Sequence, residues 1–396
     1  MAIKRVIIHL GMAKAGSSSI QDALFNNASI LEKNGFRYLT EWGRNHFRIF
    51  HYLFSQSPTN PIGTGHLGRT PSLKRIQNRK SINSMMKVID TTKCETLVLS
   101  GEYFHELYLD STIKNMEAFI NKYFTSNGIE TSVIYIIRNP LSWMISFLQE
   151  LFYKRGFLNK DGDFFDDIIR QYNGIINLKK RFPGSLIILK FEDICMDENS
   201  LVNCFLKSIG FPEQELGNIN TRRKNESRCM EVMEFIYYVE SIAPRYPYTN
   251  YRRRNPSRSR GDFSCILSIK GVKFDLPYQS KQELWARLQE TVYLLKEYTG
   301  IDYTDYNVSP SPSQELYKNE TIQGFAESFH KLNYTLQKHF LKFFEKKYME
   351  TAEEKFKQLH FKNSIPYRHY NSKNYIINYL ATLIKNKIRN FNLFND

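Results

Sequence analysis

Cysteine is scarce in this sequence, with five residues among 396. They are scattered, odd in number and never spaced as CxxC, which argues against a disulfide framework and a zinc site. No apolar run approaches the ~20 residues that a membrane-spanning helix requires, and the first residues show no signal-peptide pattern. These absences predict a cytoplasmic protein. The cysteines are Cys94, Cys195, Cys204, Cys229 and Cys265.

Positive charge, by contrast, is abundant: 55 lysine and arginine residues against 40 aspartate and glutamate residues give a net charge of +15. A positive field raises the local concentration of anions, so composition alone allows nucleotides, acidic glycans, anionic membranes or nucleic acids as partners. Signatures of RRM, KH and helix-turn-helix domains are absent, and we expect no nucleic-acid partner. Hydrophobic residues make up 42% of the chain, enough for a substantial core.

Continuous apolar runs predict buried parallel strands, because strands with one exposed face alternate in polarity. Four such runs alternate with helical patterns, which indicates an α/β fold with three layers, a central parallel sheet between two layers of helices. Ligands of such sheets bind beyond the carboxyl ends of the strands. The strands are expected at 5–11, 96–100, 132–137 and 185–189, with a weaker one at 35–39, and helices at 18–33, 140–155 and 198–209.

Residues 304–313 (TDYNVSPSPS) have the composition of a linker. We therefore expect one α/β domain over residues 1–303 and a helical, basic extension over residues 304–396. Within the extension, residues 374–391 carry apolar side chains along one helical face and basic side chains near its end. This pattern predicts a helix that packs on the main domain or contacts the inner face of an anionic membrane.

The first predicted strand leads into the loop GMAKAGSSS, residues 11–19, and then into a helix. Backbone N–H groups at a helix N-terminus attract anions, and glycines allow a phosphate to approach the backbone. A nucleotide or sugar kinase has GxxxxGK[ST] at this point. Gly11 and Gly16 keep that spacing, but Ser17 stands where the kinase lysine is expected, and Lys14 lies inside the loop. A lysine there suits a group shorter than a triphosphate, such as a phosphosulfate.

The third strong strand ends at Arg138, and Ser146 follows eight residues later, on the next predicted helix. An arginine at the carboxyl end of a strand faces the ligand edge of the sheet, and its planar fork suits bidentate binding of phosphate. The serine, about two helical turns further on, lies within reach of the same phosphate. Arg138 and Ser146 together predict a second anion site beside the loop.

Three segments resemble the family of sulfotransferases that use 3′-phosphoadenosine-5′-phosphosulfate (PAPS), and bacterial carbohydrate sulfotransferases in particular. They are HLGMAKAGSSSIQDAL at 9–24, VIYIIRNPLSWMISFLQELFYKRG at 133–156 and ILKFEDI at 188–194, and the resemblance covers about residues 5–300. It implies a P-loop-type fold, PAPS as donor without a metal, and transfer of a sulfuryl group to a hydroxyl of a polysaccharide, oligosaccharide or glycolipid.

The resemblance also implies roles for individual residues. Lys14 would stabilise charge on the leaving group, and Arg138 with Ser146 would hold the 3′-phosphate. Ala15 stands where the family commonly has threonine, a small change that leaves the anion site usable. The loop residues that would hold the 5′-phosphosulfate are Lys14, Ala15, Gly16, Ser17, Ser18 and Ser19.

Transfer to a hydroxyl also needs a general base. Glu102 directly follows the strand at 96–100, with His105 and Glu106 close behind it, and is our first candidate. Glu41 and His46, after the weaker strand, are the alternatives. Two basic clusters, at 222–224 and 252–260, are candidates for binding an acidic glycan or closing over the 3′-phosphate. A P-loop nucleotide or sugar kinase and a basic nucleic-acid-binding protein remain as alternative functions.

Overall fold

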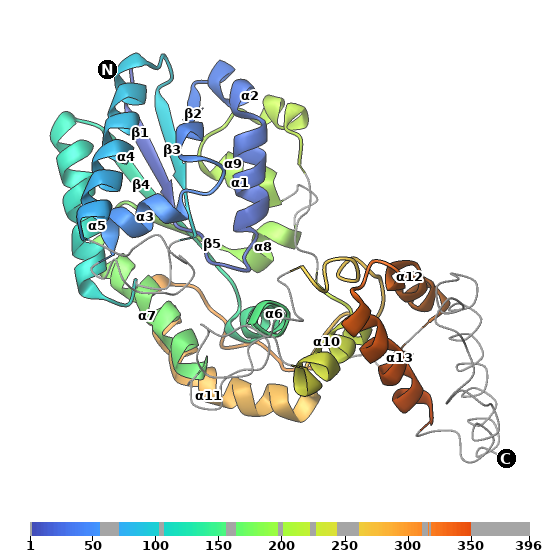
Figure 1. Ribbon diagram of the computed structural model, residues 1–396. Coiled ribbons are helices and arrows are strands. Elements are labelled where there is room, and N and C mark those ends of the chain that lie inside the picture. The colour runs from blue at the N-terminus through green and yellow to red at the C-terminus, as the bar shows by residue number, and fades with distance from the viewer. Residues whose placement is uncertain are drawn as a thin grey trace. The chain divides into compact units, whose positions relative to one another are not determined.

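The computed structural model in Figure 1 forms two compact units, each assembled from three segments of the chain. The first unit comprises Met1–Met144, Asp163–Glu226 and Gln279–Val308, and the second comprises Ile145–Gly162, Ser227–Tyr278 and Ser309–Asp396. These are units of packing, and the domain boundary expected at residues 303 and 304 stays a prediction. The residues that the structure describes are 2–55, 71–102, 107–155, 164–196, 201–221, 227–243, 261–310, 316 and 318–349.

A five-stranded parallel sheet forms the centre of the first unit, in the order β2-β3-β1-β4-β5. Its three middle strands are buried along their apolar runs, and only Arg5 in β1 and residues 130–132 in β4 are partly or fully exposed. The predicted α/β fold with a central parallel sheet is confirmed. β2, the weakest prediction, is a three-residue strand at the edge of the sheet. The strands are β1 (Arg5–His9), β2 (Phe36–Tyr38), β3 (Thr96–Ser100), β4 (Glu130–Ile137) and β5 (Leu186–Lys190).

The order of the strands places a switch point at β1. From β1 the chain reaches β2 at the edge, returns to β3 beside β1, and then crosses β1 to reach β4 on its other side. Ligands bind at such a point, beyond the carboxyl ends of the strands. His9 ends β1 opposite Ser100, which ends β3, whereas β4 continues three residues past Ile134, the partner of His9 in β4. The loop at 11–19, Glu102 and Arg138 therefore all follow strands at one edge of the sheet.

The helices around the sheet form two groups whose members contact one another, and Figure 1 shows these groups on opposite sides of the strands. This arrangement accounts for the burial of both faces of the sheet. The first group is α1 (Ser17–Asn26), α2 (Ala28–Lys33), α8 (Phe191–Met196) and α9 (Leu201–Ser208). The second is α3 (Phe47–Phe54), α4 (Pro71–Thr91), α5 (Asp110–Tyr123) and α7 (Phe164–Arg181).

One predicted helix differs from the observed one. The helix expected at 18–33 is divided at Asn27, because the Asn27 side chain donates to the carbonyls of Ala23 and Asn220 and accepts the Asn220 N–H. The helix expected at 198–209 is present as α9 from Leu201 on, while residues 197–200 lie outside the described part of the chain. Gly210, just after the helix, has a left-handed conformation. The helix expected at 140–155 is present as α6 (Pro140–Arg155).

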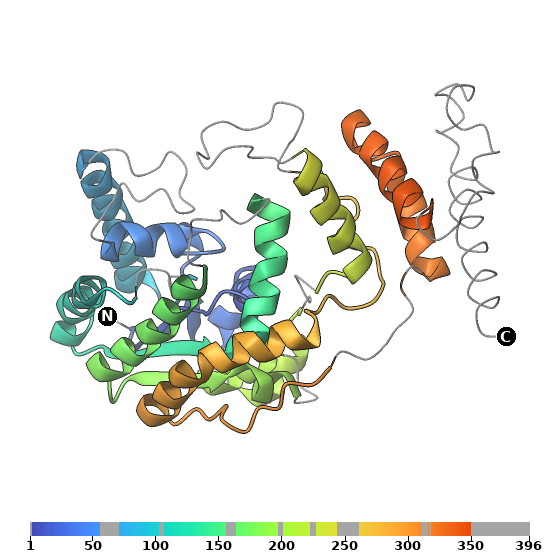
Figure 2. The same cartoon turned by 90° about the horizontal axis from the view of Figure 1, so that it is seen from below.

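The segment after α11 (Tyr278–Thr299) completes the first unit at the outer edge of β5. In Figure 2 α11 is the long orange helix, and the segment that follows it reaches β5, where the Lys190 ammonium donates to the Asp302 carbonyl at 3.5 Å. Tyr303, which follows, is buried. Residues from the end of α11 thus lie beside the carboxyl end of β5, near the start of α8.

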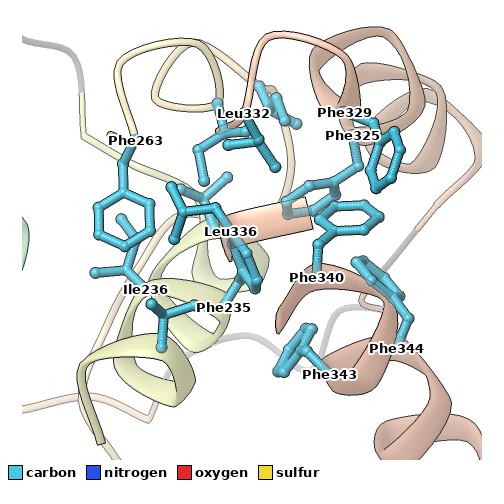
Figure 3. Close-up of a cluster of buried hydrophobic side chains, with 14 of the residues drawn as sticks. Phe235, Ile236, Phe263, Phe325, Phe329, Leu332, Leu336, Phe340, Phe343 and Phe344 are labelled. Carbon is cyan, nitrogen blue, oxygen red and sulfur yellow. The ribbon is translucent and has the colours of Figure 1, made fainter. Parts of the chain in front are cut away.

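The second unit has a separate core, rich in phenylalanine (Figure 3). Phe235 contacts Phe263, Phe325, Phe340 and Phe343, with ring centroids 5.4–6.4 Å apart. Among the described residues of both units, no helix combines the length and apolarity needed to cross a membrane. The helices of the second unit are α10 (Met230–Ile242), α12 (Asn319–Phe329) and α13 (Tyr334–Met349), together with the later part of α6.

Candidate active site

The loop between β1 and α1 has its carbonyl groups tied to side chains at three consecutive residues. Each donor comes from a helix or strand end that packs against the loop. With its carbonyls held in this way, and with the Ala15 N–H donating to the Met12 carbonyl at 3.2 Å, the loop has a fixed backbone conformation. Ser17 Oγ donates to the Met12 carbonyl at 2.9 Å, Trp143 Nε1 to Ala13 at 2.6 Å and Arg138 Nη1 to Lys14 at 2.7 Å.

The backbone of this loop is left-handed at Gly11, Lys14 and Gly16, with φ of 71°, 65° and 82°. Lys14 is the sole residue other than glycine with positive φ in the described part of the chain, and that conformation costs about 1–2 kcal/mol for a residue with a Cβ. A Cβ at Gly16 would lie 2.6 Å from Leu201 Cδ2, and one at Gly11 would lie 2.7 Å from Ser17 Oγ. A Cβ at either glycine would require a neighbouring side chain to shift, in addition to the cost of the left-handed conformation.

The N-terminus of α1, the positive end of the helix dipole, directly follows the loop. No side chain caps the helix at Gly16, and its first turn has no acidic residue. The predicted loop residues Ser17, Ser18 and Ser19 form this turn, with the Ser17 side chain buried and the other two partly exposed. The helix dipole thus adds to the charge of Lys14 in attracting an anion to the loop.

Arg138 lies directly beside the loop. Its Nη1 is bonded to the Lys14 carbonyl, and its guanidinium carbon lies 4.8 Å from the centre of the Phe191 ring. The buried Nε has no hydrogen-bond partner among the described residues. Burial lowers the Arg138 pKa, while nearby Glu192 acts to raise it. The structure thus brings together the two positive residues, Lys14 and Arg138, that the sequence assigned to neighbouring anion sites.

Glu102 also lies against the loop. Ser18 Oγ donates to Glu102 Oε1 at 3.3 Å, and a Cβ at Gly11 would lie 3.4 Å from Glu102 Cγ. The preceding Gly101 is fixed from two directions, since its N–H donates to the His9 carbonyl at 2.9 Å and a Cβ there would lie 2.8 Å from the Phe47 nitrogen. The carboxylate of Glu102 therefore lies beside the first turn of α1, at the end of β3.

His46 is completely buried behind that site. Its Nδ1 accepts the Ser100 N–H at 3.0 Å, and its ring stacks on Tyr38 with centroids 4.8 Å apart. His9, also fully buried, pairs through Nδ1 with Ser100 Oγ at 2.8 Å. Burial lowers the pKa of each histidine to about 3. Both rings are therefore neutral near pH 7, and both contact the residue that ends β3.

The remaining predicted residues lie in other surroundings. Glu41 is exposed beyond the edge strand β2 and forms an ion pair with Arg37. Ser146 is on α6, in the part of that helix that belongs to the second unit, and its role stays a prediction. His105, Glu106, the basic clusters at 222–224 and 252–260 and the stretch at 374–391 lie outside the described residues.

Sequence reasoning missed Trp143 as part of the site. The residue lies inside the quoted segment at 133–156, but an indole on an apolar helix gives no sign that its N–H reaches a loop 130 residues earlier. Among the described residues, no three histidine, cysteine, aspartate or glutamate side chains are grouped as metal ligands. The edge of the sheet thus brings together Lys14, Arg138 and the Glu102 carboxylate.

No protein-family model matches this chain, and no curated protein matches its sequence significantly. Among solved structures, the chain is similar to the crystal structure of a sulfotransferase from Alicyclobacillus acidocaldarius, with 14% sequence identity and a TM-score of 0.36. The match covers 56% of this chain and 85% of the other. A likeness of this extent carries no argument about function, which has to come from the site itself.

Proposed function

We propose that this protein transfers a sulfuryl group from PAPS to a hydroxyl group of a carbohydrate or glycolipid. The observation that carries the proposal is the 2.7 Å hydrogen bond from Arg138 to the Lys14 carbonyl. This bond joins the loop that carries Lys14 to the arginine that follows β4, the strand beside β1 in the sheet. A donor with a phosphosulfate at its 5′ side and a phosphate at its 3′ side has anions for both positive groups.

The same loop disfavours a nucleoside triphosphate as ligand. Kinases use the residue after the second glycine, a lysine, to reach the β- and γ-phosphates. Here that residue is Ser17, which is 1% exposed and donates back to the Met12 carbonyl. The positive side chain is that of Lys14, on the loop itself. Its place fits charge that develops near the first phosphate, where the bond of a phosphosulfate breaks.

The proposed reaction is a single in-line displacement at sulfur. The acceptor oxygen forms a bond to sulfur while the bond from sulfur to the bridging oxygen of the 5′-phosphate breaks. The bond's electron pair stays on the phosphate, where Lys14 and the N–H groups of the loop stabilise it. The hydroxyl proton passes to the Glu102 carboxylate. The products are a sulfate ester and adenosine 3′,5′-bisphosphate.

Glu102 is proposed as the base because its contacts with Ser18 and Gly11 hold it at the loop. His46 has no exposed surface, and its Nδ1 already accepts a backbone hydrogen bond. We therefore propose that His46 positions the end of β3 instead of taking the proton. Glu41, engaged by Arg37 on the surface, is a weaker candidate.

Nucleotide binding tests the proposal before any acceptor is known. Calorimetry with adenosine 3′,5′-bisphosphate should give tight binding without Mg²⁺, and ATP should bind poorly with or without Mg²⁺. Strong Mg²⁺-dependent binding of ATP would favour the kinase instead. Labelled PAPS should then be assayed against bacterial polysaccharides and lipid-linked oligosaccharides. Label in a protein or nucleic acid, and in none of these acceptors, would refute the acceptor class.

A further inference from the structure

Glu192, the residue after Phe191 in the segment ILKFEDI, lies beside Arg138 without forming an ion pair with it. Its two oxygens are occupied elsewhere. Oε1 accepts the backbone N–H of Asn139 at 2.9 Å, and Oε2 accepts the hydroxyl of Tyr303 at 2.9 Å. A carboxylate next to a half-buried arginine is usually its strongest partner, because the two groups match in shape and charge. Here the carboxylate is held by two other donors.

Arg138 therefore keeps part of its binding capacity. Nη1 donates to the Lys14 carbonyl, but no described carboxylate approaches the guanidinium within 4.0 Å, and Nε, although buried, has no hydrogen-bond partner there. The Phe191 ring lies 4.8 Å from the guanidinium carbon. These contacts fix the orientation of the guanidinium and leave donors for an anion.

We propose that Tyr303 is a positioning residue that sets the preference of this site for a 3′-phosphate, by holding Glu192 away from Arg138. This inference rests on the proposed function. Without the Tyr303 hydroxyl, Oε2 of the partly buried Glu192 loses its partner, and the positive charge of Arg138, on which Glu192 already acts, attracts it. The carboxylate then competes with the phosphate for the guanidinium.

Tyr303 is well suited to this task. It is 5% exposed, so water replaces its hydroxyl poorly as a partner of Glu192. Burial and the neighbouring carboxylates raise its pKa, which keeps the hydroxyl protonated, and therefore a donor, at any physiological pH. The Lys190 ammonium lies 5.0 Å from the centre of its ring and donates to the carbonyl of Asp302, which anchors the preceding residue beside β5.

The test compares dissociation constants for adenosine 3′,5′-bisphosphate and adenosine 5′-monophosphate, which differ only in the 3′-phosphate. Their ratio reports recognition of that phosphate, whereas general damage to the fold weakens both ligands together. Tyr303→Phe should lower the preference for the bisphosphate about tenfold. Glu192→Gln keeps an acceptor for the Asn139 N–H, removes the competing charge, and should match or exceed the wild-type preference. The double variant should regain the wild-type preference.

The matched control is Tyr306→Phe. Tyr306 is three residues away, is exposed, and packs on Trp285 with ring centroids 5.0 Å apart. The preference of this variant for the bisphosphate should therefore equal that of the wild type. A wild-type preference in Tyr303→Phe, or a double variant as poor as Tyr303→Phe, would overturn the inference. A wild-type protein that does not prefer the bisphosphate would instead refute the proposed function, so the two failures are distinct.

Discussion

The guanidinium of Arg138 donates a 2.7 Å hydrogen bond to the carbonyl of Lys14, a residue 124 positions earlier in the chain. Lys14 adopts a left-handed conformation that an ordinary residue avoids, and this bond is one of the contacts that maintain it. The arginine assigned to one phosphate thus also shapes the loop assigned to the other. Changes at Arg138 are expected to affect both ends of the donor, but unequally.

Arg138→Ala should weaken binding of adenosine 3′,5′-bisphosphate by about 30- to 150-fold, since a charge-assisted contact is worth roughly 2–3 kcal/mol. Binding of adenosine 5′-monophosphate should fall less, because it loses only the indirect support of the Lys14 carbonyl. Calorimetry on the two nucleotides measures both effects. Equal losses would mean that Arg138 supports the loop and does not bind the 3′-phosphate.

Lys14→Ala should reduce kcat by ~10²-fold or more, because the ammonium acts on charge that appears in the transition state. Lys14→Gly removes the same side chain but suits the φ of 65°, so it should be more stable than Lys14→Ala by about 1 kcal/mol. Both variants should be equally inactive with PAPS. Activity retained in either folded variant would remove Lys14 from the mechanism.

Trp143→Phe should weaken binding of adenosine 3′,5′-bisphosphate about tenfold, because the Ala13 carbonyl would lose its hydrogen-bond partner and the loop would lose its fixed orientation. Trp42→Phe is the matched control. Trp42 is also buried and donates to a backbone carbonyl, that of Ser81 at 3.3 Å, but away from the loop. Thermal melts of both variants separate stability from binding. Equal affinity in the two variants would show that Trp143 only packs.

The strands were predictable because burial on both faces produces unbroken apolar runs, a property of a few adjacent residues. The break at Asn27 was not, since it depends on a hydrogen bond to Asn220, 193 residues away. The residues of the candidate site show the same contrast between local patterns and distant contacts. Gly11, Gly16 and Lys14 form a local pattern, whereas Trp143 enters the site only through the fold. Sequence also could not show that His46 is enclosed while Glu102 faces the loop.

The two buried histidines should make the first unit sensitive to acid. Each has a pKa of about 3 when folded and about 6.5 when unfolded, so the unfolded chain binds more protons between these values. Stability is therefore lost as the pH falls below 6.5, by about 2 kcal/mol per histidine at pH 5.

The variant His46→Gln keeps an acceptor for the Ser100 N–H but does not titrate. Between pH 6.5 and pH 5, the unfolding free energy of this variant should fall less steeply than that of the wild type. The difference in slope should correspond to about one bound proton per molecule. Urea unfolding at several pH values, followed by tryptophan fluorescence, provides the comparison. Parallel curves for the two proteins would show that His46 binds its proton as readily in the folded state as in the unfolded chain.

Glu102→Gln tests the base. The amide retains an oxygen that can accept the Ser18 hydroxyl, so the contacts of this side chain with the loop should survive. A general base contributes roughly 10²- to 10⁴-fold, and kcat should fall by that order while the affinity for adenosine 3′,5′-bisphosphate stays near wild type. The acidic limb of the pH–rate profile should disappear, because it reports protonation of the carboxylate.

The comparison variants are His46→Gln and Glu41→Gln. His46 is enclosed by Tyr38, Trp42 and Phe50, and Glu41 is paired with Arg37, so neither change removes a group that faces the loop. Both variants should keep most of the wild-type kcat at pH 7.5, where their stability is least affected. If His46→Gln alone abolishes turnover and Glu102→Gln is near wild type, the histidine is the base. The buried ring would then have to become exposed when the acceptor binds, because a proton can be taken only by a group that reaches the hydroxyl.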